Sequence, residues 1–263
     1  MDIRDIKDEV RYPGKHAFEE LFNLQLILVD HYTKIESLPE YPIDINTKEG
    51  QDLIKDFAAR ITEEFGEGFE SYLVMLDMFH QGTPEEEMIP HLQNFNEEIA
   101  DAIHFWLELM IFSGFNAHTI GKWMGQSGAV PGMMEGLLAQ AREEVENETH
   151  HKRFPGRWVI KDHMLKDEFL RGGRLLGNER KAMMKQLLWD NTYWLQIARN
   201  TLKNKPWKQT GMMTDLNQYE DALANCTFSM FKFFAFCGFT AESIYTIYFK
   251  KNKVNQFRIE SKY

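Results

Sequence analysis

The sequence predicts an all-α fold, a multi-helix bundle that forms a single domain over residues 1–263, and two observations support this. Apolar residues recur at helical spacing in several long segments, and stretches rich in proline and glycine separate these segments. The chain is 43% apolar and contains 20 phenylalanines and 6 tryptophans. That content is enough for a sizeable core and argues against disorder.

Three helices are expected in the first half of the chain. The first covers about residues 14–32, and a loop with two prolines follows at 37–50. The second covers about 51–80, where Phe57, Ile61, Phe65, Tyr72 and Leu76 form one apolar stripe. The third follows a break expected at 82–87 and ends near Gly114, because glycine favours the C-terminal cap of a helix.

The second half contains a less regular and mobile insertion, expected at about 118–178, where several glycines interrupt the helical pattern. Helices are expected again at about 179–202 and 216–239, and a shorter one begins near Thr240. The segments EEIADAIHF and SGFNAHTI resemble EDALANCTF and CGFTAESI further along the chain. This similarity reflects either a weak duplication or coincidence.

Composition excludes several classes of function. The net charge of -10 disfavours a nucleic acid as the principal ligand, because proteins that bind nucleic acids generally carry a basic face. No apolar run is long enough for a membrane span, so we expect a soluble cytoplasmic protein without a membrane partner. With only Cys226 and Cys237, neither a disulfide framework nor a thiolate metal cluster is expected.

Four acidic residues on two predicted helices are candidate metal ligands. Glu98 and Asp101 are three residues apart on a largely apolar helix, so both side chains face the interior. Buried carboxylates need a partner, and no lysine or arginine lies between Gln81 and Gly121. Glu64 and Glu67 lie at the border of the apolar stripe of the preceding helix. They face either a neighbouring helix or solvent.

If the two acidic helices pack side by side, their four carboxylates converge. Carboxylate oxygens suit a hard divalent cation, so the expected metal is Mg²⁺, with Mn²⁺ as a possible substitute. Magnesium held by carboxylates usually completes its coordination shell with substrate phosphates and water. The acidic site would then bind a nucleotide through the metal.

The C-terminal region and the first helix provide the other candidate ligands. Lys251, Asn255 and Arg258 share one face of a helix at i, i+4 and i+7, an arrangement suited to phosphate oxygens. A solvated basic tail would give the same pattern. Gln25 lies within the apolar first helix. It is either a hydrogen-bonded core residue or an amide that reads the edge of a base.

Together, four motifs in order resemble the all-alpha NTP pyrophosphatases, in particular the dimeric dUTPase branch and its phage dUTPase and dCTPase-like relatives. EFGEGFES resembles the first metal helix of that family, ExxExxxS, and EIADAIHF resembles the second, ExxDxxHF. KKNKVNQFR resembles the phosphate-binding segment KNxxNxxR. Gln25 lies where the family has a glutamine that recognises the base. Val29 stands where the family often has asparagine, which bears on base selectivity.

The resemblance implies hydrolysis of a pyrimidine deoxynucleoside triphosphate, dUTP or dCTP, to the monophosphate and pyrophosphate. It implies Glu64, Glu67, Glu98 and Asp101 as Mg²⁺ ligands and Glu67 as the group that activates water. Lys251, Asn255 and Arg258 would bind phosphate, and Gln25 the base. It also implies a homodimer, located in the host cytoplasm if a phage encodes it.

Two other readings remain open on the sequence. A di-iron carboxylate bundle also uses inward-facing acids, but it needs two Glu-x-x-His helices. This chain offers Asp101 with His104 and Glu148 with His151, and neither pair fits well. A helical protein that binds nucleotides without turning them over would retain the same ligands.

Overall fold

The computed structural model describes residues 10–36, 38–125, 131–148, 176–204, 207, 209 and 211–261, and all regular secondary structure within these ranges is helical. This confirms the predicted all-α class. A short 3-10 turn, η2 (Gly14–His16), leads into the first of the α-helices. In chain order these are α1 (Ala17–Glu36), α2 (Lys48–His80), α3 (Glu85–Phe112), α4 (Ala117–Trp123), α5 (Met133–Glu148), α7 (Leu176–Thr201), α8 (Leu216–Cys237) and α9 (Ala241–Glu260).

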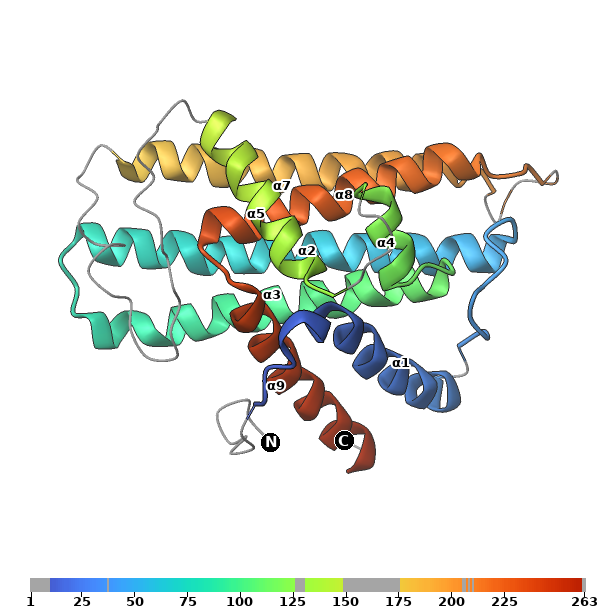
Figure 1. Cartoon of the computed structure of the whole chain (residues 1–263), viewed down its shortest axis with the longest axis horizontal. Helices are drawn as coiled ribbons and strands as arrows, with labels where there is room; N and C mark the ends of the chain where they lie inside the picture. The colour runs from blue at the N-terminus through green and yellow to red at the C-terminus, as the bar shows by residue number, and fades with distance from the viewer. Residues whose placement is uncertain are drawn as a thin grey trace.

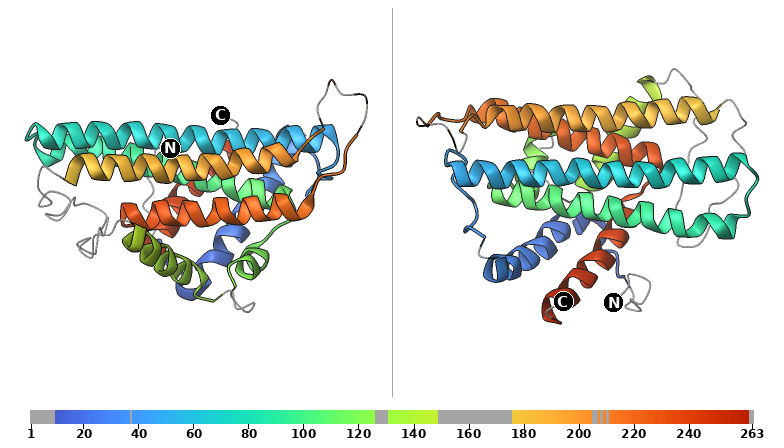
Figure 2. Two further views of the ribbon diagram at one scale, coloured as in Figure 1. Left: turned by 90° about the horizontal axis from the view of Figure 1, so that it is seen from above. Right: turned by 180° about the vertical axis from the view of Figure 1, so that it is seen from behind.

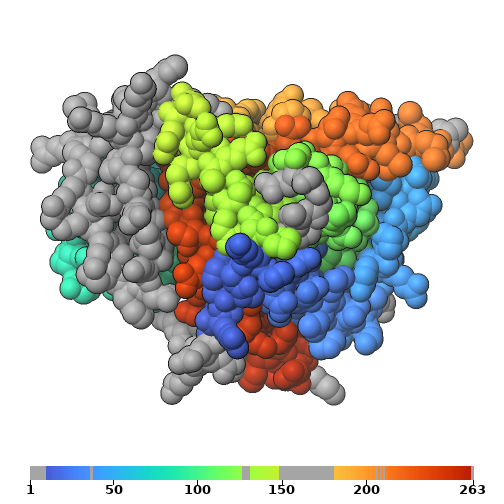
Figure 3. All heavy atoms as spheres, viewed as in Figure 1, coloured from blue at the N-terminus to red at the C-terminus, as the bar shows by residue number. Residues whose placement is uncertain are grey.

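The long helices form a bundle of two hairpins (Figures 1 and 2). The helices α2 and α3 make the most extensive contact in the molecule, α7 packs against α8, and α2 contacts α7. The helices α1 and α9 contact each other and α3, and they diverge from the bundle on the α3 side (Figure 2). In the space-filling view, α4, α5 and the start of α1 form a continuous surface over one face (Figure 3).

Helix boundaries follow local capping chemistry. Thr47 caps α2 by accepting a hydrogen bond from the backbone N–H of Gly50, so the helix begins three residues before the predicted start. Thr240 and Ser243 form a reciprocal capping box at the start of α9. The break predicted at 82–87 is shorter, because Glu85 already belongs to the first turn of α3, where acids are favourable against the helix dipole.

The repeated sequence pattern has a structural counterpart at two helix ends. Gly114 after α3 and Gly238 after α8 both have positive φ angles, 85° and 82°. In each case a phenylalanine follows, and then Asn116 or Thr240 caps the next helix by accepting from a backbone N–H three residues on. Two hairpins of the bundle therefore turn into their next helix in the same way.

Aromatic and aliphatic side chains from both hairpins fill a common core. Trp106 on α3 is 1% exposed, and its indole N–H donates to Thr227 Oγ1 on α8 at 3.2 Å, so burial leaves no polar atom of this side chain unsatisfied. Within the described residues no single helix is long and apolar enough to cross a membrane. The pair α8 and α9 meets that test only together, with a bend of 105° between them.

The predicted insertion at 118–178 is described only in part. Its helices α4 and α5 are regular and pack against α1 and α8, respectively. Residues 126–130 and 149–175 lie outside the described residues, and so does His151 of the Glu148–His151 pair. Irregularity and mobility in this insertion stay predictions.

Candidate active site

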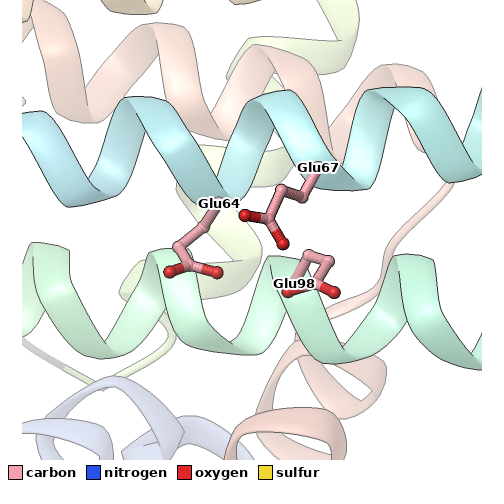
Figure 4. A group of neighbouring side chains, drawn as sticks. All are labelled: Glu64, Glu67 and Glu98. Atoms are coloured by element: carbon pink, nitrogen blue, oxygen red, sulfur yellow. The ribbon is translucent and has the colours of Figure 1, made fainter.

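Three of the four predicted acidic ligands meet between α2 and α3. Glu64 and Glu67 extend from α2 toward α3, and Glu98 extends from α3 toward them (Figure 4). One carboxylate oxygen from each side chain lies within 4.8 Å of the other two. The spacing of three residues on α2 places Glu64 and Glu67 on one side of the helix. The predicted convergence of the two helices is confirmed for these three residues.

A glycine permits the close approach of the two helices at this point. A Cβ atom at Gly68 would lie 3.5 Å from Glu98 Cβ and 3.5 Å from Ile99 Cδ1, which is van der Waals contact. Any side chain longer than alanine at this position would push against α3. Alanine would also fit, so the close approach of α2 and α3 beside Glu98 requires a small residue at position 68.

Mutual proximity and burial change the ionisation of these carboxyl groups. Burial and the neighbouring Asp101 and Glu98 carboxylates raise the pKa of Glu64 from 4.5 to about 8. Burial raises the pKa of Glu98 as well, against a lowering effect from its hydrogen bond with Glu64. Each shift reflects the cost of bringing negative charges together away from water. A cation at this position would relieve that cost.

The fourth acid, Asp101, is paired with a lysine. Its Oδ2 lies 2.6 Å from the Nζ of Lys251 on α9, and only 22% of the Asp101 side chain and 11% of the Lys251 side chain are exposed. Burial raises the pKa of Asp101, and Lys251 opposes that rise. Asp101 is near enough to Glu64 to raise the pKa of Glu64. Asp101 therefore lies at the edge of the acidic cluster while it is paired with Lys251 of α9.

The predicted phosphate-binding face of α9 lies beside this cluster. Lys251 is buried against Asp101, Asn255 is half-buried, and Arg258 is exposed. The Arg258 guanidinium is close enough to lower the pKa of Asp101 against the larger effect of burial. The face of α9 therefore has one cation fixed against the acids and one directed toward solvent.

Gln25 lies in the core, within a hydrogen-bonded network. Its side chain is 0% exposed, and its Oε1 lies 2.7 Å from both Tyr248 Oη, which donates to it, and His104 Nδ1. Its Nε2 donates to Glu108 Oε1 at 3.0 Å. A base can reach this amide only if one of these contacts opens. Recognition of the base by Gln25 stays a prediction.

Sequence reasoning missed the partners of Gln25. Tyr248 and Asn252 on α9 lie one turn apart, and Asn252 Nδ2 donates to Tyr248 Oη at 3.3 Å and to the Leu24 carbonyl at 3.4 Å. Helical spacing could have identified Tyr248 and Asn252, because they lie on successive turns of one face of the helix, next to Lys251. The network ties α1 to α9, which carries the predicted phosphate-binding face.

His104 is a buried packing residue in this structure. Its ring stacks on Tyr248 with centroids 4.3 Å apart, and burial lowers its pKa to about 3, so it is neutral at working pH. Its Nε2 has no hydrogen-bond partner among the described residues. His104 does not belong to the three-carboxylate cluster.

Replacing Gln25 by leucine is expected to lower the free energy of unfolding by about 1–3 kcal/mol, because Tyr248 and Glu108 lose buried partners. Urea denaturation measures this. Asn23→Leu on the exposed side of α1 is the control, with an expected change of about 0.5 kcal/mol or less. Equal stability of both variants would show that the network contributes nothing.

The donor set fits a hard divalent cation. All three converging ligands are carboxylates, and Mg²⁺ binds such oxygens at about 2.0–2.1 Å, so oxygens on one ion are at most about 4.2 Å apart. Small side-chain rotations would bring oxygens within 4.8 Å of one another to that spacing. Glu64, Glu67 and Glu98 would hold the ion, with Asp101 available once Lys251 moves to a phosphate.

A family model described as dUTPase matches residues 175–263. This range contains Lys251, Asn255 and Arg258, whereas the acids of α2 and α3 and Gln25 lie outside it. No curated protein and no solved structure matches the chain. The match supports hydrolysis of a nucleotide pyrophosphate bond as the class of reaction. The all-helical fold and this match over residues 175–263 fit the all-alpha dUTPase-like superfamily.

Proposed function

We propose that the protein hydrolyses a pyrimidine deoxynucleoside triphosphate, dUTP or dCTP, to the monophosphate and pyrophosphate in the presence of Mg²⁺. One observation carries the proposal: three carboxylates of α2 and α3 meet beside the Lys251–Asp101 pair that brings in α9. Cation-binding acids and phosphate-binding cations are thus adjacent. The family match supports a nucleotide as the substrate. The resemblance of the four sequence motifs supports a pyrimidine as its base.

Mg²⁺ bound by the carboxylates would neutralise phosphate charge and lower the pKa of a coordinated water. Glu67 is the exposed member of the cluster and has access to solvent. It accepts the proton of the attacking water and orients that water toward the phosphorus. Lys251 and Arg258 hold the phosphate oxygens whose negative charge increases in the transition state, and Asn255 donates an amide hydrogen bond to them.

Initial rates of pyrophosphate release from a panel of deoxynucleotides test the base preference. The panel contains dUTP, dCTP, dTTP and dATP, each with Mg²⁺, with Mn²⁺ and with EDTA. We expect turnover of a pyrimidine substrate with Mg²⁺, slower or comparable turnover with Mn²⁺, and none with EDTA. Equal rates with EDTA would contradict the metal requirement, and a preference for dATP would contradict the pyrimidine assignment.

Two further observables separate the alternatives. Thermal stabilisation by dUTP and Mg²⁺ without any product would favour a protein that binds nucleotides without hydrolysing them. Stoichiometric iron and an optical absorption band would favour the di-iron reading.

Sedimentation equilibrium tests the proposed homodimer, and a monomer at assay concentration with full activity would contradict it.

Magnesium is expected to stabilise the protein more at pH 8 than at pH 5.5. The pKa of Glu64 is about 8 in the folded protein and ordinarily 4.5, so its protonation stabilises the fold below pH 4.5. That stabilisation is lost as the pH rises toward 8. Mg²⁺ needs the ionised carboxylate, so its binding strengthens over the same interval and offsets the loss. Melting curves at both pH values measure the difference, and Glu64→Gln should reduce it.

A further inference from the structure

A polar hollow lies on the side of α2 that faces away from the acidic cluster. It has a volume of about 220 Å³, and it lies between the N-terminal half of α2 and the end of α7. Its lining consists of Lys55, Gln196, Arg199, Asn200, Leu202 and Lys203. Lys55 and Glu64 are nine residues apart on α2, which is two and a half turns, so they point to opposite sides of the helix.

The hollow concentrates positive charge in a protein whose net charge is -10. Three of its lining residues are cations, and none is an acid. Among the described residues, Lys55 forms an ion pair with Asp52, whose Oδ1 lies 3.7 Å from Lys55 Nζ and whose side chain is 48% exposed. Arg199 lies in the last turn of α7, where a helix dipole is equivalent to about half a negative charge. Three full positive charges outweigh that half charge and Asp52.

Internal hydrogen bonds connect the cations and the amides of the lining. Arg199 Nη1 donates to Gln196 Oε1 at 3.4 Å, and Lys203 Nζ donates to Asn200 Oδ1 at 2.9 Å. Both amide oxygens are thereby occupied by cations, which leaves the two NH₂ groups as the remaining polar parts of these amides. Lys55 Nζ donates to the Asn204 carbonyl, which holds this lysine in place.

We propose that this hollow binds a phosphate-type oxyanion, either inorganic phosphate or pyrophosphate. The lining provides hydrogen-bond donors from two amide NH₂ groups and three cations. Its two side-chain amide oxygens already accept hydrogen bonds from Arg199 and Lys203. Charge-assisted hydrogen bonds from several such donors suit the oxygens of a tetrahedral anion. The volume accommodates one or two phosphate groups. Bound there, the anion links α2 to the segment that follows α7.

The site is independent of the proposed catalysis, because its residues lie outside the acidic cluster and outside the face of α9. Binding is measured without metal, in EDTA, so that the carboxylate cluster repels anions instead of binding them. Isothermal titration with phosphate and, separately, with pyrophosphate distinguishes the two sources. The test variant is Arg199→Gln with Lys203→Gln. The matched control is Lys181→Gln with Lys185→Gln, which removes two cations from the same helix far from the hollow.

We expect one anion per chain to bind to the wild-type protein and the control with equal affinity. The test variant should bind at least tenfold more weakly, with an unchanged circular dichroism spectrum. Affinity should also fall as NaCl is raised, because the lining is open to solvent. Equal affinity of the test variant and the wild type, or no binding by the wild type at millimolar anion, would overturn the proposal.

Discussion

Glu67→Gln is expected to lower kcat by about 10²–10⁴-fold, because the amide cannot accept the proton of the attacking water. The substitution preserves size and removes a carboxylate that has an oxygen within 4.8 Å of oxygens of Glu64 and Glu98. Relief of that repulsion should leave the folded protein at least as stable as the wild type. Pyrophosphate release with saturating dUTP and Mg²⁺ measures the effect, and melting curves verify the fold.

The matched control for this variant is Glu70→Gln. Glu70 is also exposed on α2, but it does not belong to the three-carboxylate cluster. Its replacement makes the same change of charge within one turn of Glu67. We expect activity within about twofold of the wild type. Equal losses in both variants would show that the charge of α2 matters in general and that Glu67 has no special role.

Lys251→Met is expected to lower kcat/KM by about 10²–10³-fold, because the buried cation proposed to hold phosphate oxygens is lost. It should also lower the free energy of unfolding by about 1–3 kcal/mol, since Asp101 is left without the ion pair at 2.6 Å. Lys253→Met on the same helix is the control. Lys253 is half-buried and contacts Gln256, and it lies away from Asp101.

A double variant separates the two roles of Lys251. Combining Lys251→Met with Asp101→Asn removes the unpaired buried acid, so stability should return toward that of the wild type. Activity should not return, because neither the phosphate contact nor the metal ligand is restored. Recovery of activity with stability would show that Lys251 acts only through the fold.

The helices and the acidic cluster were predictable because both depend on local spacing. The apolar stripe of α2 places Glu64 and Glu67 at its border, where they face either a neighbouring helix or solvent, and the apolar surroundings of Glu98 place it inside. Antiparallel packing of α2 and α3 is the usual result of a short connection such as the turn at Gly82, and it brings the three acids together.

Contacts between distant segments were not predictable from spacing. The bond between Asp101 and Lys251 depends on how α9 crosses α3, and no periodicity specifies a crossing angle. The contacts of Gln25 with His104 and Tyr248 depend on the same crossing. A helical pattern shows that these residues face inward, but it does not identify their partners.

The proposed reaction is hydrolysis between the α- and β-phosphates of a pyrimidine deoxynucleoside triphosphate. Phosphorus NMR of dUTP or dCTP incubated with the protein and Mg²⁺ tests it directly, because every product is observed at once. We predict resonances of the monophosphate and of pyrophosphate in equal amounts, and an unchanged spectrum with Glu67→Gln. Formation of a diphosphate and inorganic phosphate, or an unchanged spectrum with the wild-type protein, would contradict the claim.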